Sequence, residues 1–494
     1  MRCASRGVAG DGPVGPPSAV VYRYDLKLRK DDAPLSGVVG FQMSAGGDKA
    51  LYRQGENWNI ASLRPMPNGP GAAPPPNGGP PQGSLKTAGI EVRVDPVAEW
   101  KQMYREAWRI ERDWFYDRNA HGFDLSEGEK TYEPYLAGIA SRYDLTYLFR
   151  EMLGRLNVSH LSTGGGDTPD VKRVQTGLLG ADYEVANGRY RFARVYTGEN
   201  WNPQLRAPLT QPGVNVKAGD YLLAVNDREV RAPENVYRFF EGQAGKSVVL
   251  KVSADAAGSD PRNVTVVPVA DEYDLRNLAW IEQNRRTVDK LSDGKVAYVY
   301  MPDTAQGGLT AFNRYFYAQV GKQAAIIDER FNNGGMLATD IAEILNRKPL
   351  SAASNRTGAD LVQPQGIFGP KVMIINERAG SGGDAMPWYF KRSGAGTLVG
   401  TRTWGGLVGM AGAPSLMDGG VVTAPSSGIY NPLTGEWEVE NIGIAPDVEV
   451  EQDPALVRAG HDPQLEKAVE VVMEQLKKSP LPTLRRPSFP KYPR

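Results

Sequence analysis

The spacing of apolar residues divides this chain of 494 residues into four stretches. Residues 20–63 alternate apolar and polar positions, which predicts short antiparallel strands. Residues 95–170 repeat apolar positions every three or four residues, which predicts helices. Residues 171–270 are again rich in strand and turn signals, and residues 290–450 alternate strands with helices. This length and patterning predict three or four domains rather than a single core.

Two amphipathic helices are predicted within residues 95–170. The first begins at Asp95-Pro96, an N-cap residue followed by proline at the first helical position. The second is expected to run from about Asp144, as its N-cap, to Leu156. Its apolar face consists of Leu145, Leu148, Phe149, Met152, Leu153 and Leu156. The i, i+3, i+4 spacing indicates that both helices turn this face to a core.

Residues 216–230 predict a turn at Gly219-Asp220, a strand, a tight turn at Asn226-Asp227 and a second strand. A glycine-flanked apolar loop, Gly177–Gly180, precedes another strand. This combination resembles a PDZ domain, which adds a peptide strand to the open edge of its sheet. An unrelated small β-domain is the alternative.

The region from 290 to 450 has the pattern of a layered α/β domain. Buried-type strands are predicted at Val296–Tyr300, Ala324–Asp328 and Lys371–Asn376. Helices are predicted at 308–319 and 337–347. Short apolar runs of this kind are typical of strands that are covered on both faces.

Composition excludes several classes of function. Lys and Arg number 57, as do Asp and Glu, so no charge imbalance favours nucleic acid or an anionic membrane. No run of about 18 apolar residues occurs, so no membrane insertion is expected. Cys3 is the one cysteine, and the three histidines are scattered, which argues against disulfides, a metal centre or another cofactor. Residues 1–19 lack the apolar segment of a signal peptide.

Ser381 is the first candidate for chemistry. It lies in Gly380-Ser381-Gly382-Gly383, directly after the strand that ends near Asn376 and before a helical stretch from about Ala385. A serine at such a strand-to-helix turn can present its hydroxyl to a substrate, and the helix N-terminus offers free N–H groups. A plain glycine-rich turn is the alternative.

A serine nucleophile needs a base, and histidine is the usual one near neutral pH. His160 follows the second predicted helix, in Asn157-Val158-Ser159-His160. His121 and His461 lie in turn-like segments without a comparable setting. A hydrogen-bonded loop histidine remains the alternative for His160.

A second glycine turn, Asn332-Asn333-Gly334-Gly335, follows the strand that ends at Asp328. Backbone N–H groups at such a turn can converge on an oxyanion, although the sequence alone is ordinary turn chemistry. The order of the motifs is more specific than any single one. In chain order they are Asn157 to His160, the PDZ-like insert, Asp328 to Gly335, Ala379 to Asp384, Gly400 to Gly406 and Val439 to Asp447.

This order closely resembles the C-terminal half of the tricorn proteases, within the wider group of C-terminal-processing serine peptidases, over roughly residues 90–480. The resemblance implies that Ser381 is the nucleophile and His160 the general base. It further implies that Ser159 hydrogen-bonds the imidazole, that Glu440 orients Ser159, and that the N–H groups of Gly334 and Gly382 form the oxyanion hole. No metal is implied.

The predicted tetrad meets one geometric difficulty. Neighbouring residues of an extended segment point to opposite sides, so Ser159 reaches His160 only if the loop turns there. Asn157 could supply that turn.

The sequence also departs from the family pattern. Gly382 stands where the archaeal member has an acidic residue, and residues 349–355 contain no Asp or Glu where that member's basic specificity is determined. The lysine base of other C-terminal-processing peptidases has no evident equivalent near Ser381. Lys391 lies ten residues on, nearly three helical turns away.

The fold class expected from these features is multidomain α/β. The expected domains are a β-propeller remnant at 1–63, a Pro/Gly linker at 64–89, a helical subdomain at 90–170, a PDZ-like domain at 171–272, an α/β catalytic domain at 273–480 and a disordered tail at 481–494. The resemblance implies a crotonase-like arrangement of ββα units for the catalytic domain.

The leading hypothesis is therefore a serine peptidase that cleaves peptides through a Ser-His-Ser-Glu tetrad. A catalytically inactive PDZ-type peptide-binding scaffold is the alternative, and an esterase using similar residues is a third possibility. The resemblance implies a homo-oligomer, with a hexamer as the family's assembly. The cytoplasm is the expected compartment, and export to the periplasm is the alternative if an N-terminal region is missing.

Overall fold

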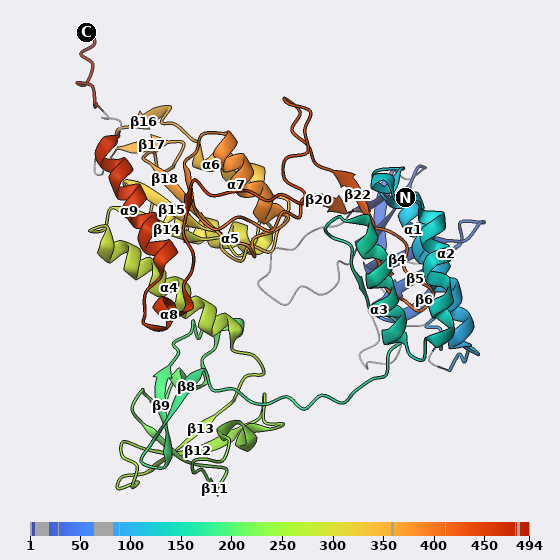
Figure 1. Ribbon diagram of the computed structural model, residues 1–494, viewed down its shortest axis with the longest axis horizontal. Helices are drawn as coiled ribbons and strands as arrows, with labels where there is room; N and C mark the ends of the chain where they lie inside the picture. The colour runs from blue at the N-terminus through green and yellow to red at the C-terminus, as the bar shows by residue number, and fades with distance from the viewer. Residues whose placement is uncertain are drawn as a thin grey trace. The chain divides into compact units, whose positions relative to one another are not determined.

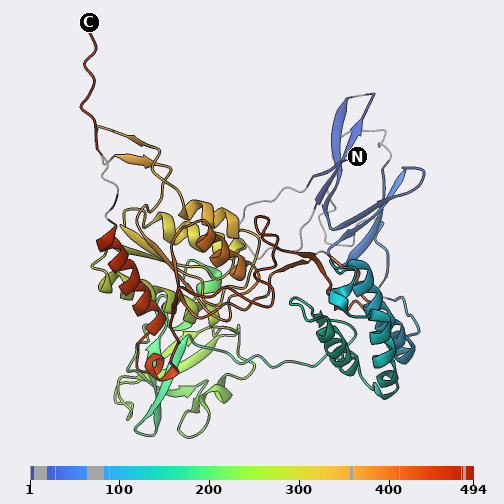
Figure 2. The ribbon, with the colours of Figure 1, turned by 45° about the horizontal axis from the view of Figure 1, so that its top comes forward.

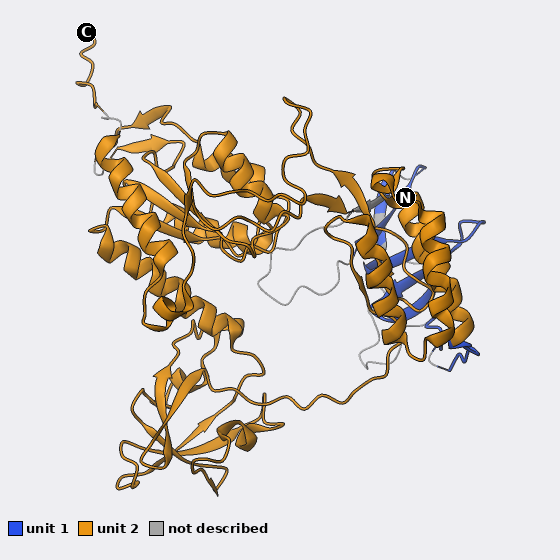
Figure 3. Cartoon of the chain, in the orientation of Figure 1, with its two compact units in different colours: residues 1–96 blue, residues 97–494 orange. Residues whose placement is uncertain are grey.

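The computed structural model describes residues 2–4, 19–27, 29–63, 83–87, 89–356, 360–410, 412–479, 481 and 485–493. The chain divides into two compact units, residues 1–96 and residues 97–494 (Figure 3). Most of the predicted linker, residues 64–82 and 88, lies outside the described residues, as do 480, 482–484 and 494 near the C-terminus.

The first unit contains two antiparallel sheets of three strands, drawn in blue in Figure 2. The first sheet consists of β1 (Arg2–Ala4), β2 (Ala19–Asp25) and β3 (Lys30–Val38), and the second of β4 (Gly40–Met43), β5 (Lys49–Gln54) and β6 (Asn57–Ser62). Val21, Leu35, Ala50 and Tyr52 are among the side chains of its small core. The alternating pattern of residues 20–63 thus predicted the strands correctly.

The second unit begins with helices that pack through their apolar faces. They are α1 (Pro96–Trp114), α2 (Leu125–Tyr132) and α3 (Arg142–Leu153), with 3₁₀ turns at Ala120–Gly122, Glu133–Gly138 and Gly154–Leu156. The prediction of Asp144 as an N-cap was wrong by three residues. Ser141 caps α3, and Asp144 occupies the N3 position of a capping box, where its carboxylate accepts from the Ser141 N–H at 2.9 Å.

A strand pair connects the loop after α3 with a much later segment. β7 (Thr163–Gly164) pairs with β21 (Val421–Val422). The Ser162 N–H also donates to Thr423 Oγ1 at 2.7 Å across 261 residues, and Thr423 Oγ1 donates to the carbonyl of His160 at 2.6 Å. A neighbouring antiparallel pair joins β20 (Val408–Met410) to β22 (Pro425–Gly428). Residues 408–428 therefore hold the loop that carries His160.

The predicted PDZ-like region forms an antiparallel sheet in the order β13-β12-β10-β9-β8, with β11 paired to β10. The strands are β8 (Ala181–Ala186), β9 (Arg189–Val195), β10 (Tyr221–Val225), β11 (Arg228–Glu229), β12 (Val248–Ser253) and β13 (Arg262–Val266). Short 3₁₀ turns lie at Pro203–Leu205, Pro208–Thr210 and Val236–Phe240. Asn226 and Asp227 both have positive φ, as the predicted tight turn between β10 and β11 requires.

The α/β region is built on a parallel five-stranded sheet in the order β14-β15-β18-β19-β23. Its strands are β14 (Val296–Tyr300), β15 (Ala324–Asp328), β18 (Lys371–Ile375), β19 (Thr397–Gly400) and β23 (Val448–Glu449). Every residue of β14, β15 and β18 is buried, which explains why their sequences are apolar runs apart from Asp328 at the end of β15 and Lys371 at the start of β18.

Helices cover both faces of this sheet (Figure 1). One face packs on α4 (Tyr273–Leu291) and α9 (Pro463–Lys478), and the other on α5 (Gln306–Tyr317), α6 (Ala338–Leu345) and α7 (Gly382–Arg392). The short helix α8 (Pro454–Arg458) precedes α9, and an exposed hairpin is formed by β16 (Ser351–Ala353) and β17 (Leu361–Gln363). The predicted helices at 308–319 and 337–347 differ from α5 and α6 by only one or two residues at each end.

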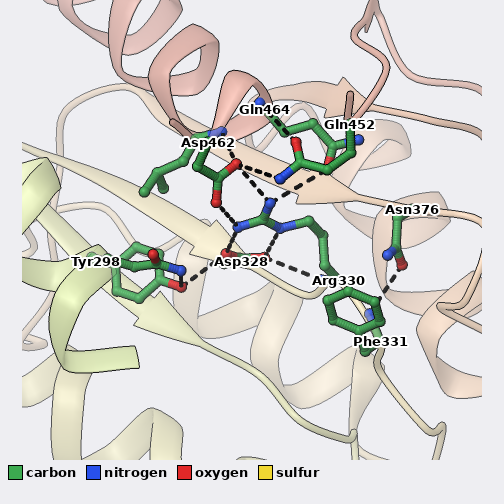
Figure 4. Close-up of polar contacts among 10 residues, drawn as sticks. Tyr298, Asp328, Arg330, Phe331, Asn376, Gln452, Asp462 and Gln464 are labelled. Atoms are coloured by element: carbon green, nitrogen blue, oxygen red, sulfur yellow. Dashed lines mark hydrogen bonds and ion pairs between the residues drawn. The ribbon is translucent and has the colours of Figure 1, made fainter. Parts of the chain in front are cut away.

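A buried ion-pair network fixes the end of β15 (Figure 4). The Arg330 guanidinium donates two hydrogen bonds to Asp328, at 2.7 and 2.9 Å, and two to Asp462, both at 2.9 Å. Asp462 is also the N-cap of α9, and the Tyr298 hydroxyl donates to Asp328 at 2.8 Å. The network therefore ties the segment after β15 to α9 and β14.

Glu111 is a buried carboxyl on α1 for which the described residues supply no hydrogen bond. Burial raises the pKa of Glu111 to about 8, from an ordinary value of 4.5. Between pH 4.5 and about pH 8, the Glu111 carboxyl is deprotonated in the unfolded chain but stays protonated in the folded chain. The free energy of unfolding should therefore fall as pH rises through this window, by about 1.4 kcal/mol per pH unit.

We expect Glu111→Gln to remove this pH-dependent part of the free energy of unfolding. The variant should therefore become more stable relative to the parent chain as the pH rises from about 5 to about 8. Urea unfolding across this range measures the difference. Glu127→Gln, at an exposed position on α2, is the control. If the free energies of unfolding of the parent chain and of Glu111→Gln changed in parallel with pH, the raised pKa of Glu111 would be contradicted.

Candidate active site

Ser381 lies on a strained turn between β18 and α7. Its φ of 60° and ψ of −116° are unusual for a residue with a side chain. Its N–H lies 2.9 Å from Asp384 Oδ2 and 3.0 Å from the carbonyl oxygen of Gly406. Gly382 is required next, because a Cβ there would lie 2.0 Å from Thr304 Oγ1. The predicted serine elbow is therefore present and tightly packed.

Asp384 holds this turn against the loop at 403–407. The buried carboxylate accepts hydrogen bonds from Thr403 Oγ1 at 2.5 Å, the Gly405 N–H at 2.8 Å and the Gly406 N–H at 3.0 Å, besides the Ser381 N–H. Burial raises the pKa of Asp384, and these four hydrogen bonds oppose the rise. Removing the carboxylate would release both the elbow and the loop.

The loop after α3 turns twice and brings Ser159 onto His160. Asn157 has a φ of 47° and His160 a φ of 60°. The second positive φ folds the imidazole back, so that Ser159 Oγ lies 2.8 Å from His160 Nδ1. Asn157 thus supplies part of the predicted turn, and His160 itself supplies the rest.

Glu440 completes this cluster. It accepts hydrogen bonds from the Ser159 N–H at 2.6 Å, from Ser159 Oγ at 3.0 Å and from the Leu407 N–H at 2.6 Å. Because the single hydroxyl proton of Ser159 goes to Glu440, Ser159 Oγ accepts from His160. This arrangement favours the imidazole tautomer with its proton on Nδ1, which leaves the Nε2 lone pair available.

Trp404 links the two halves of the site. Its ring lies 5.6 Å, centre to centre, from that of His160, and the backbone N–H of Trp404 donates to the Ala379 carbonyl at 2.9 Å. A Cβ on Gly380 would lie 2.5 Å from Trp404 Cε3. Trp404 is therefore a common neighbour of His160 and of the serine elbow. Among the described residues no hydrogen bond joins Ser381 Oγ to His160.

The electrostatic setting of His160 favours the neutral imidazole. Burial lowers the pKa of His160, and it outweighs the opposing influence of Glu440 and Asp384, which stabilise the charged form. A neutral imidazole near pH 7 is what a general base requires.

The two expected oxyanion donors differ in their surroundings. The Gly382 N–H, at the start of α7, has no acceptor within the described part of the chain. The Gly334 N–H donates to Asn332 Oδ1 at 2.9 Å instead. Gly334 nevertheless lies beside the serine, because a Cβ there would be 2.6 Å from Ser381 Cβ.

The remaining histidines and Lys391 are occupied elsewhere. His121 Nε2 lies 2.6 Å from the Tyr116 hydroxyl, and exposed His461 pairs with Glu466 at 3.0 Å. Lys391 Nζ pairs with Asp447 at 2.6 Å. Within the described ranges no cluster of three or more His, Cys, Asp or Glu side chains is placed to hold a metal ion.

Sequence reasoning assigned no role to Asp384 or Trp404. A signal for Asp384 was present, since an acidic residue three positions after a serine is the pattern of a helix capping box. Trp404 offered no comparable signal, because its contact with His160 joins segments that are far apart in the chain.

A cavity of about 440 Å³ opens next to these groups. It is lined by Tyr273, Phe331, Asn333, Glu377, Arg378 and Trp404. Three of these side chains are aromatic, and Asn333 directly precedes Gly334. The cavity therefore adjoins both the glycine turn and Trp404, the aromatic neighbour of His160.

Three family models match successive parts of the chain. The tricorn protease C1 domain matches residues 96–154, the tricorn protease PDZ domain residues 177–271, and peptidase family S41 residues 295–450. Together they follow the order of helices, PDZ-like sheet and α/β region found in the structure.

Individual relatives agree. Tricorn protease homolog 1 of Streptomyces coelicolor is 33% identical over 99% of this chain and 46% of its own length. The putative tricorn-like protease C-terminal subunit of Sulfurisphaera tokodaii is 35% identical over 80% of this chain and 45% of its own length. The crystal structure of the tricorn protease superposes with a TM-score of 0.82 at 29% identity, covering 94% of this chain and 44% of that chain.

Residues 295–450 form a domain of peptidase family S41. With a tricorn C1 domain before and a tricorn PDZ domain after the loop that carries His160, the chain is a relative of the tricorn proteases. The chain spans less than half the length of the relatives described above. The resemblance inferred from the order of the motifs is thereby confirmed.

The influence of Glu440 on the pKa of His160 can be tested by substitution. Glu440→Gln should lower the pKa of His160 further, because the carboxylate that favours the imidazolium is lost. NMR titration of the imidazole protons measures this pKa, with the resonances of exposed His461 as an internal reference. An unchanged or higher pKa for His160 would mean that Glu440 does not act on the imidazole.

Proposed function

We propose that this chain is the catalytic part of a serine peptidase that hydrolyses peptide bonds through Ser381, His160, Ser159 and Glu440. The observation that carries the proposal is the hydrogen-bonded series from Glu440 through Ser159 to His160. This series shares Trp404 with the strained elbow of Ser381. Membership of family S41 gives independent support.

The proposed reaction begins with transfer of the Ser381 hydroxyl proton to His160 Nε2 as Ser381 Oγ attacks the scissile carbonyl. The imidazolium then returns the proton to the leaving amine, and an acyl-enzyme ester remains on Ser381. Water, deprotonated by the same nitrogen, hydrolyses the ester and regenerates the hydroxyl. Glu440 keeps the Nδ1 proton of His160 directed at Ser159 Oγ throughout. Gly382, and Gly334 once its N–H is free, stabilise the tetrahedral oxyanion.

The cavity beside Trp404 is the proposed binding place for a substrate side chain. Its three aromatic side chains suit an apolar or aromatic residue, and the charges of Glu377 and Arg378 in its lining oppose each other. The stretch 349–355 carries no acidic side chain. A basic residue before the cleaved bond is therefore not the expected preference.

The finer architectural assignments belong to the same proposal. The two sheets of residues 1–63 fit a remnant of a β-propeller, residues 64–89 a linker, 90–170 a helical subdomain, 171–272 a peptide-binding PDZ-like domain and 273–480 a crotonase-like catalytic domain. A homo-oligomer is proposed from the family resemblance. The described residues contain no helix with the length and apolarity needed to cross a bilayer. That finding does not identify a compartment, and the cytoplasm is proposed separately.

An inactive peptide-binding scaffold is the competing function. The contacts around His160 disfavour it, because peptide binding by a PDZ-like sheet needs neither a polarised imidazole nor a strained serine elbow. An esterase is disfavoured by the PDZ-like insert, since small esters need no sheet edge to dock on.

Ser381→Ala tests the nucleophile. The variant should lose labelling by a fluorophosphonate probe and should no longer cleave peptides, because no other hydroxyl occupies the elbow. Peptide binding, measured by fluorescence anisotropy, should be retained. Cleavage by Ser381→Ala would show that another residue is the nucleophile, and a parent chain that binds peptides without labelling would favour the scaffold.

His160→Ala should lower kcat by about 10²–10⁴-fold, the range expected for loss of a general base. His121→Ala and His461→Ala are matched controls, because both histidines have hydrogen-bond partners outside the site. Steady-state cleavage of a quenched fluorescent peptide measures all three. Equal losses at the three positions would indicate damage to folding rather than to catalysis.

A further inference from the structure

The Gly334 N–H is occupied although it lies next to the nucleophile. It donates to Asn332 Oδ1 at 2.9 Å inside the protein, while a Cβ on Gly334 would touch Ser381 Oγ at 3.0 Å. A donor that stabilises an oxyanion has to point at the oxygen that becomes negative. In the arrangement described, the Gly334 N–H, one of the two expected oxyanion donors, is therefore unavailable to a substrate.

The side chain that takes this N–H is itself incompletely satisfied. Asn332 is fully buried, and its Nδ2 has no acceptor among the described residues. Because Oδ1 faces the Gly334 N–H, the amide orientation is fixed and Nδ2 points elsewhere. A buried amide group without a partner favours any nearby arrangement in which it finds an acceptor.

An unused acceptor lies on the same turn. Glu329 is fully buried, and neither of its carboxyl oxygens has a hydrogen-bond partner within the described ranges. The Asn332 N–H donates to the Glu329 carbonyl at 3.0 Å, so the two residues are the ends of one tight turn. Burial raises the pKa of Glu329 well above its ordinary range, so the neutral acid still offers a carbonyl oxygen.

Asn332 lies against the first turn of α7, because a Cβ on Gly383 would lie 3.0 Å from Asn332 Cβ. Glu329 is within electrostatic range of the same turn, since the charges of Asp384 and Asp328 add to the rise of its pKa. The turn is also built to change shape. Phe331 has a φ of 67°, Gly334 of 86° and Gly335 of 137°, so strain and glycine freedom are combined there.

We propose that Asn332 is a positioning residue that closes and opens the oxyanion hole. In the closed state Asn332 Oδ1 holds the Gly334 N–H. In the open state the Asn332 amide rotates and donates through Nδ2 to the buried carboxyl of Glu329, and the Gly334 N–H is released toward the oxyanion. The proposal rests on the proposed peptidase function, and it adds a resting state that substrate binding has to convert.

A structure of the full chain with a peptide aldehyde bound to Ser381 tests the open state directly. The Gly334 N–H should point at the hemiacetal oxygen, and Asn332 Nδ2 should lie within hydrogen-bond distance of a Glu329 oxygen. An adduct in which Asn332 Oδ1 still holds the Gly334 N–H would overturn the proposal. So would a water molecule that permanently bridges Asn332 Nδ2 and Glu329.

Kinetics of matched variants separate this role from a structural one. Glu329→Leu removes the acceptor and should lower kcat about tenfold with KM within about twofold, whereas Glu329→Gln keeps a carbonyl oxygen and should stay within about threefold of the parent chain. Asn332→Asp can hold the Gly334 N–H but has no amide to donate, so kcat should fall by about 10²-fold. If Glu329→Leu and Glu329→Gln lowered kcat by the same factor, the proposal would be overturned.

Hydrogen exchange of the Gly334 amide gives a readout that needs no activity. In the Ser381→Ala chain, Glu329→Leu should slow this exchange several-fold because the closed state gains population, and Glu329→Gln should leave it near the parent rate. If the Gly334 amide exchanged at the same rate in Ser381→Ala alone and in combination with Glu329→Leu or Glu329→Gln, the closed and open states of Asn332 would be refuted. This would hold even if peptide cleavage by the parent chain were confirmed. Failure of the peptidase proposal would look different: the fluorophosphonate probe would not label Ser381 in the parent chain, while exchange in the Ser381→Ala chain would still respond to Glu329→Leu.

Discussion

One short loop connects the two groups on which the candidate site depends. The successive N–H groups of Gly405 and Gly406 donate to Asp384, and the next N–H, of Leu407, donates to Glu440. Asp384 fixes the serine elbow, and Glu440 fixes Ser159 and through it His160. Because adjacent peptide groups have a fixed separation, the two carboxylates cannot move independently, and the serine and histidine inherit that constraint.

The surroundings of the site combine rigid and soft parts. Arg330, with two carboxylate partners and almost no exposure, anchors the start of the glycine turn to α9. Breaking such a buried pair by removing one partner is strongly destabilising, by about 3–5 kcal/mol. On either side of Arg330, Glu329 and Asn332 leave buried polar atoms without partners among the described residues. The turn is thus held firmly through the Arg330 side chain and weakly through its two neighbours, beside Ser381.

Much of this arrangement could be predicted from the sequence where local pattern determines structure. The buried strands β14, β15 and β18 are apolar runs apart from the terminal Asp328 and Lys371, and the glycines around Ser381 mark the elbow. The positive φ of His160 could not be predicted, because it is uncommon for non-glycine residues and depends here on distant segments. Glu440 holds the Ser159 N–H, and Thr423 holds the carbonyl of His160. The hydrogen bond from the Gly334 N–H to Asn332 Oδ1 could not be predicted either, because an Asn-Asn-Gly-Gly sequence does not reveal which acceptor a backbone N–H will find.

The pairing of Ser159 with Glu440 has a consequence for biosynthesis, because the two residues are 281 positions apart. Ser159 and His160 leave the ribosome early, the serine elbow follows after the whole PDZ-like insert, and Glu440 comes later still. Until that carboxylate has been synthesised, nothing among the described contacts orients the Ser159 hydroxyl toward a fixed acceptor. On the proposed mechanism, a nascent chain therefore carries Ser381 and His160 in an unassembled form, which would protect it from cutting itself or its neighbours during translation.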